Sequence, residues 1–131
     1  AALVLDEIVD AAGTAHAARL DAALARALLA AVAPQQILSV ALGHFQRLRQ
    51  WRIRLDAGDD ARSILAAARP KPHFSRTSDL ERQIRTWSDP ALAIATARIY
   101  SAIAESRRAP LLAQPILHRT MLAICRMAAE N

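Results

Sequence analysis

Residues 34–56 read PQQILSVALGHFQRLRQWRIRLD, and this stretch decides how the chain folds. Apolar side chains and one histidine recur in it at steps of three and four, which is the spacing of one helical face. They are Ile37, Val40, Ala41, His44, Leu48, Trp51 and Leu55. Pro34 suits the first turn of a helix, where its missing amide hydrogen is not needed. The stretch therefore predicts a long helix with one continuous apolar stripe.

Shorter helices are expected on both sides of this segment. Their spans are about residues 3–12, 15–33, 60–68, 77–87, 89–106 and 112–129. Glycine and proline residues separate them, and Gly58 suits a left-handed turn after the long helix. Ser78 with Glu81 matches a capping box, and Asp89 before a proline matches an N-cap.

The composition also favours helices over strands. Of the 131 residues, 53% are hydrophobic but only 4% are aromatic, and just 3 are glycines. Alanine, which is abundant here, has the lowest helix cost of any residue. The length fits one domain with a single core, in which Trp51 and Trp87 are expected because both fall on apolar stripes. We therefore expect an all-α bundle of about six or seven helices.

The charge and the cysteine content indicate which kind of partner and which cell compartment suit this chain. The formal net charge of +5 attracts phosphate-rich partners, although the dispersed arginines also suit the solvated faces of helices. The single cysteine, Cys125, excludes an internal disulfide and fits a reducing compartment. Acidic residues near the N-terminus argue against a signal peptide, and the most apolar stretch is too short to cross a bilayer. We expect a cytoplasmic protein with no membrane partner.

Residue types that carry catalysis or bind metals are present but scattered. The 4 histidines form no HxxxH or HExxH pair, and His44 is interpreted as a hydrogen-bonded residue in the core or at its boundary. Cys125 lies among apolar residues, where a thiol is normally inert. Asp6, Glu7 and Asp10 are interpreted as a solvated acidic face. Because no Gly-rich phosphate loop occurs either, we expect no catalytic residue, metal or cofactor.

The loop at residues 69–76, RPKPHFSR, differs from the rest of the chain. Its two prolines hold the backbone extended. Phe74, between Lys71 and Arg76, can present its ring to an unpaired nucleic-acid base while the flanking cations hold phosphates. The alternative is that Phe74 fills a gap between two helices, and spacing alone favours this alternative.

The order of several segments is more specific than any one residue. The segments are LDEIVDAA at 5–12, residues 16–33, HFQRL at 44–48, RPKPHFSR at 69–76 and LxxQIxxW at 80–87. Together they resemble the C-terminal collar domain of the delta subunit of bacterial DNA polymerase III, a component of the sliding-clamp loader. The resemblance implies that residues 1–13 end an AAA+-type lid domain and that residues 14–131 form the helical collar. One departure is SRRAP at 106–110: after Ile103, the family often has a lysine and a polar turn.

The resemblance implies assembly rather than catalysis. Collar domains hold the five loader subunits together, so the delta prime and gamma/tau subunits are the implied partners. The parent holoenzyme is a DNA polymerase, but the delta subunit is not an ATPase, and no cofactor is implied. The sliding clamp would be bound by an N-terminal domain, which we expect to be missing because no initiator Met precedes Ala1. The collar lies near the template strand, which favours contact between primer-template DNA and Phe74, Lys71 and Arg76.

A collar domain also needs an apolar surface for its neighbours. On the long helix, Leu38, Leu42 and Phe45 form a second row beside the main stripe. We expect this row to be exposed in the isolated chain and to form a subunit interface.

Two other classes of function are open on the sequence alone. One is a free-standing helical nucleic-acid-binding regulator that uses Arg47, Arg49, Arg52 and Arg54 on a recognition helix, although these arginines do not share one face. The other is an all-helical enzyme, which would need a pocket with convergent polar groups.

Overall fold

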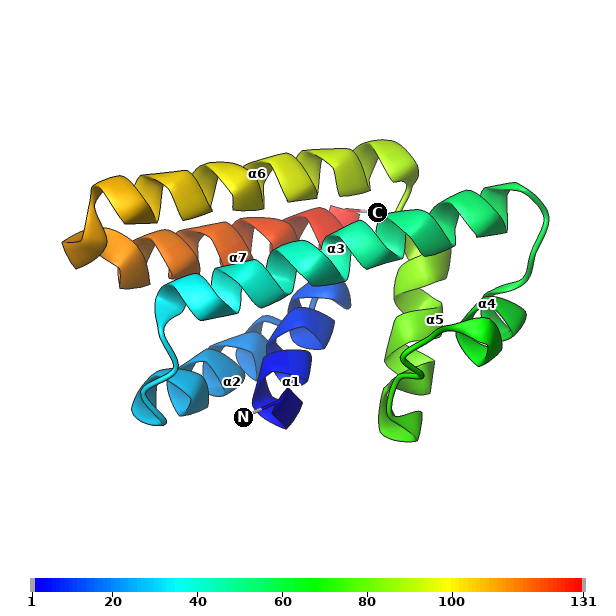
Figure 1. Ribbon diagram of the computed structural model, residues 1–131, viewed down its shortest axis with the longest axis horizontal. Coiled ribbons are helices and arrows are strands. Elements are labelled where there is room, and N and C mark those ends of the chain that lie inside the picture. The colour runs from blue at the N-terminus through cyan, green and yellow to red at the C-terminus, as the bar shows by residue number, and fades with distance from the viewer. Residues whose placement is uncertain (1, 131) are drawn as a thin grey trace.

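The computed structural model describes residues 2–130, all of whose regular structure is helical (Figure 1). The α-helices are α1 (Ala2–Gly13), α2 (Ala17–Leu29), α3 (Pro34–Asp56), α4 (Ala61–Ala67), α5 (Thr77–Thr86), α6 (Asp89–Arg108) and α7 (Ala113–Glu130). Two short 3₁₀ turns, η1 (Phe74–Arg76) and η2 (Pro110–Leu112), precede α5 and α7. The prediction of an all-α bundle of six or seven helices is confirmed. Within residues 2–130 no helix is long and apolar enough to span a membrane.

The helices form one long layer with two smaller groups beneath it. Helices α3, α6 and α7 lie side by side along the long axis, while α1 and α2 pack under one part of this layer and α4 and α5 under the other (Figure 1). Trp87 is fully buried and meets Phe45 edge to face, with 5.3 Å between the ring centroids. Trp51 is also buried, so the prediction of both tryptophans in the core is confirmed.

The structure corrects the predicted second apolar row of α3. Leu38 and Phe45 are fully buried in the core of the chain itself, and Leu42 is partly buried against that core. The cause is that α6, α7, α5, α4 and α1 all pack against α3. Both rows of α3 are therefore used internally, and the expectation that Leu38, Leu42 and Phe45 form an exposed association surface is wrong.

Helix α1 is part of the same core as the rest of the bundle. It packs against α2, α7 and α3, and Ile8, Val9 and Ala12 are buried in the common hydrophobic cluster. The boundary expected after residue 13 therefore does not coincide with a break in the core. The assignment of residues 1–13 to a lid domain stays a prediction.

The helix ends differ from the predicted caps at two places. Helix α6 is capped by Ser88, whose side chain accepts the Ala91 amide, so Asp89 is its first helical residue. Helix α5 begins at Thr77 directly from η1 and has no side-chain cap, so the capping box predicted at Ser78 is wrong. The positive φ of 114° at Gly58 confirms the expected left-handed turn.

Candidate nucleic-acid interface

The loop at residues 69–76 joins α4 to α5 and is fixed to the bundle by several hydrogen bonds. Arg47 of α3 donates to the carbonyl oxygen of Pro70 at 2.7 Å. The guanidinium of Arg69 donates to the backbone oxygens of Ala66 and Ala68 at 3.1 and 2.7 Å. The loop is therefore a defined part of the fold, and its side chains are presented from a set position.

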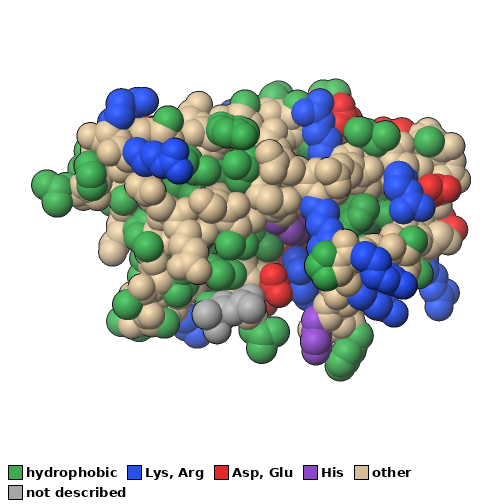
Figure 2. Space-filling view, in the orientation of Figure 1, with side chains coloured by type: hydrophobic (Ala, Val, Ile, Leu, Met, Phe, Trp, Pro, Cys, Tyr) green, Lys and Arg blue, Asp and Glu red, His purple; other side chains and the backbone are tan. Residues whose placement is uncertain are grey.

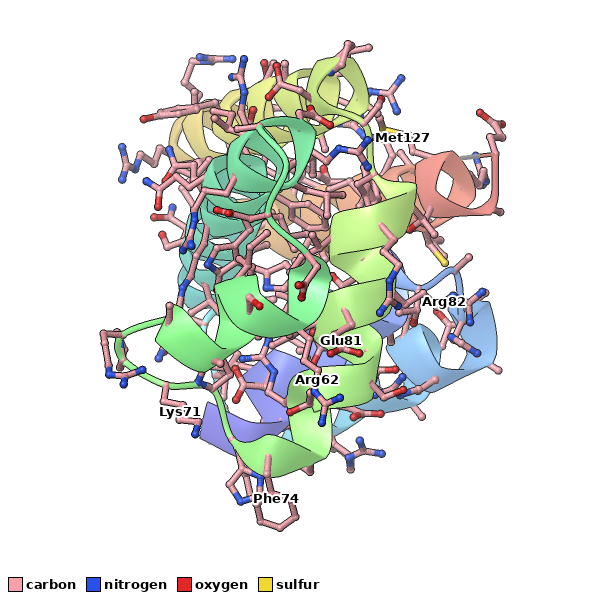
Figure 3. The ribbon with its side chains drawn as sticks, turned by 90° about the vertical axis from the view of Figure 1, so that its right-hand side faces the viewer. Arg62, Lys71, Phe74, Glu81, Arg82 and Met127 are labelled. Carbon is pink, nitrogen blue, oxygen red and sulfur yellow. The ribbon has the colours of Figure 1, made fainter. Side chains whose placement is uncertain are left out.

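Phe74 projects from this loop into solvent. Its side chain is 82% exposed, and Figure 3 shows it pointing away from the body of the molecule. The ring of His73 lies beside it, with 4.4 Å between the centroids and 30° between the planes. The alternative interpretation, that Phe74 fills a gap between helices, is therefore wrong. An exposed aromatic ring supported by a second ring is a surface on which a base can stack.

Two cationic side chains line the same cavity as Phe74. Lys71 of the loop and Arg62 of α4 are exposed, and neither side chain has a hydrogen bond or ion pair with any of residues 2–130. Figure 2 shows cationic side chains gathered over α4 and the loop that follows it. The sequence pattern did not single out Arg62. The feature that indicates it is an outward position on a short helix whose inner face carries the buried Ile64 and Leu65.

Arg76 has a different role from the one predicted. Its Nε donates to Asp10 Oδ2 at 2.8 Å and its Nη2 to Asp10 Oδ1 at 3.1 Å. Its Nη1 lies 3.3 Å from Asp6 Oδ1, and only 15% of its side chain is exposed. Because Asp10 is 3% exposed and needs a cation, Arg76 is engaged with α1 and is not free to hold a phosphate. The expected phosphate contact by Arg76 is thus corrected to an internal ion pair.

The ion pair extends into a polar network inside the bundle. Gln83 donates to Asp10 Oδ1 at 3.0 Å, and its Oε1 lies 2.7 Å from His44 Nε2. Because an amide oxygen can only accept, His44 donates through Nε2. Burial lowers the pKa of His44 to about 4, so the ring is neutral near pH 7. The prediction of a hydrogen-bonded histidine in the core or at its boundary is confirmed.

The acidic side of α1 is also paired rather than solvated. Glu7 accepts from Arg19 Nη2 at 2.9 Å, and that nitrogen also donates to Asp79 at 2.9 Å. The hydrogen bond from Arg19 lowers the pKa of Glu7. The interpretation of Asp6, Glu7 and Asp10 as a solvated face is wrong, because Arg19 of α2 and Arg76 of η1 lie against this side of α1.

The arginines of α3 are likewise engaged within the chain. Arg49, Arg52 and Arg54 pair with Asp89, Asp56 and Asp59 at 2.8, 3.0 and 3.1 Å. Arg47, besides its bond to the loop, lies over the ring of Trp51 at 4.6 Å. These contacts weaken the case for α3 as the recognition helix of a duplex-binding regulator.

Groups with nucleophilic or metal-binding chemistry do not converge in the described part of the chain. Cys125 is buried, and burial raises the pKa of its thiol, which disfavours the reactive thiolate. Among residues 2–130, no three His, Cys, Asp or Glu side chains gather closely enough to hold a metal ion. Among residues 2–130, the loop with Phe74 and Lys71, together with Arg62 of α4, is therefore the best-supported candidate site.

Comparison with known proteins found no protein-family model, no curated protein and no solved structure that matches this chain.

Proposed function

We propose that this chain is a non-catalytic helical assembly domain of the clamp-loader collar type, and that its loop contacts single-stranded template DNA. The observation that carries the DNA contact is the exposed ring of Phe74, which lines one cavity together with Lys71 and Arg62, two exposed cations with no side-chain partner among residues 2–130. A base stacked on an exposed ring contributes roughly 1–3 kcal/mol, and flanking cations add phosphate contacts. The family resemblance supports the same reading, since a collar lies beside the emerging template strand.

The assembly role places the chain in the cytoplasm, with the delta prime and gamma/tau subunits as partners. Its subunit interface must lie elsewhere than on Leu38 and Phe45, which are inside the core. The most exposed large apolar side chains are Leu29 at the end of α2 and Leu111 in η2, at 88% and 97% exposed. Side chains of this kind support a surface that a neighbouring subunit covers. Primer-template DNA would then be contacted by the assembled loader.

Binding of a labelled single-stranded oligonucleotide, followed by fluorescence anisotropy, tests the DNA contact. We expect Phe74→Ala to weaken binding about fivefold or more, in line with the loss of one stacked base. Tyr100→Ala is the matched control, because Tyr100 is also an exposed aromatic residue but lies on α6. If both variants bind like the unchanged protein, Phe74 does not contact DNA.

Two further measurements separate the proposal from the regulator alternative. Co-purification with the delta prime and gamma/tau subunits of the same genome tests the assembly role. Tight, salt-sensitive binding of duplex DNA by the isolated chain, equal to its binding of single strands, would favour a free-standing regulator instead.

A further inference from the structure

A small cavity opens beside Phe74, between α4, the loop and the start of α5. Its volume is about 240 Å³, and its apolar lining includes Leu65, Pro72 and Leu80. Leu65 and Leu80 are 6% and 1% exposed, so the floor of the cavity is a fixed part of the core. The cavity is therefore preformed by packing and does not require a movement of the chain.

The polar groups of the cavity are few and mostly cationic. Arg62 and Lys71 belong to its lining, and Figure 3 places them on α4 and on the loop, on the side of the molecule from which Phe74 projects. Thr77 is the single uncharged polar side chain of the lining. An apolar interior with cations suits a ligand that has a flat or apolar part joined to an anion.

The walls define the shape of that ligand. Phe74 also lines the cavity. His73 lies beside its ring, but Phe74 is still 82% exposed. Part of the ring surface is therefore open to a ligand. Pockets for drug-sized ligands begin at about 300 Å³, so this cavity is sized for a single ring system. A base stacked against Phe74 would fill it.

We propose that this cavity captures one unstacked base of a single DNA strand, with the adjoining phosphates on Lys71 and Arg62. The inference rests on the proposed DNA contact and adds a site: the strand is held by insertion of one base, not by surface stacking alone. With only Thr77 to contact a base edge, the site discriminates little between bases, which suits a template of any sequence.

Filling the cavity tests this inference. Ala66 and Ala67 are neighbouring exposed residues of α4, but only Ala66 lines the cavity. In anisotropy titrations with an oligothymidylate, we expect Ala66→Phe to weaken binding about fivefold or more, as for loss of one stacked base, while Ala67→Phe stays within about twofold. Circular dichroism and thermal melting check that both variants keep the fold.

A second arm removes the base instead of the cavity. We expect an oligomer of abasic sites to bind the unchanged protein more weakly than the oligothymidylate, and Ala66→Phe to abolish most of that difference. Lys71→Gln should reduce the slope of log affinity against log salt by about 0.7, the value for one phosphate of a single strand. Arg82→Gln is its matched charge control, because Arg82 is an exposed residue of α5 outside the cavity.

The outcomes distinguish this inference from the proposed function. If Phe74→Ala weakens binding but Ala66→Phe does not, DNA contact stands and base insertion is overturned. If neither variant changes binding, or the protein does not bind single strands, the proposed DNA contact itself fails. Binding of a short peptide with an apolar C-terminal residue, in place of the oligonucleotide, would also overturn the inference.

Discussion

Removing Arg76 should destabilise the fold far more than removing a surface arginine of the neighbouring helix. Arg76→Gln deletes both hydrogen bonds to Asp10 and leaves that carboxylate, 2% exposed as a residue, with Gln83 as its remaining side-chain partner. Breaking a buried ion pair from one side costs roughly 3–5 kcal/mol. Because 15% of the Arg76 side chain reaches solvent and water can enter after the change, we expect the lower end, about 3 kcal/mol.

The control is Arg85→Gln on α5. Arg85 is 57% exposed and pairs with Glu81 at 3.4 Å, one turn away, so its loss should cost less than about 1 kcal/mol. Urea unfolding, followed by the fluorescence of the buried Trp51 and Trp87, measures both free energies of unfolding. The double variant Asp10→Asn with Arg76→Gln should recover part of the loss, since no buried charge is left without its partner. Equal losses below about 1 kcal/mol for the two single variants would refute the assignment of Arg76 to an internal ion pair.

Three further predictions concern two glycines, Gly13 and Gly43, the hydrogen-bonded His44, and the N-cap of α6. Gly13→Ala should destabilise by about 2 kcal/mol or more, because a Cβ there would overlap Gln83 Oε1 and lie 2.6 Å from Gln83 Cδ, and Gln83 is held by hydrogen bonds to Asp10 and His44. Gly43→Ala, with open space around the added Cβ, should stabilise by about 0.5–1 kcal/mol. Chemical denaturation of both variants checks the two signs. Burial lowers the pKa of His44 to about 4, so between pH 6.5 and 4 the unfolded chain binds a proton that the native chain does not. Stability should therefore fall by up to about 3 kcal/mol over that range, and His44→Gln should lack this part of the fall when unfolding is measured at each pH. Ser88→Ala removes the N-cap of α6 and should lower the free energy of unfolding by about 1 kcal/mol, which thermal melting would detect as a lower melting temperature. An unchanged melting temperature would show that the cap does not contribute.

The fold was largely predictable because its main signals are local. The stripe on residues 34–56 and the interrupting glycine and prolines act over one or two turns, so the all-α architecture and the extent of α3 could be read directly. The burial of Trp51 and Trp87 and the hydrogen-bonded His44 followed from the same periodicity. A second row on α3 was visible too, but periodicity cannot tell whether a neighbouring helix or a partner covers it. Leu38 and Phe45 proved to face helices of the same chain.

The candidate site was only partly predictable, because its contacts join residues far apart in sequence. Phe74 and Lys71 were found from composition and spacing within one loop, although only the structure decided that Phe74 is exposed. Arg76 was misassigned because its partner Asp10 lies 66 residues earlier, on the first helix. Nothing in the local sequence distinguishes an arginine that meets such a partner from one that faces solvent.

Because Arg76 forms an ion pair with Asp10, the position of helix α1 affects the position of the Phe74 ring. Arg76 follows Phe74 by two residues, so a displacement of α1 relative to α5 either breaks the ion pair or carries the loop with it. If the loop binds a strand as proposed, whatever keeps α1 packed against the bundle should also favour that binding. By thermodynamic reciprocity, a bound strand should in turn hold α1 in place against the bundle.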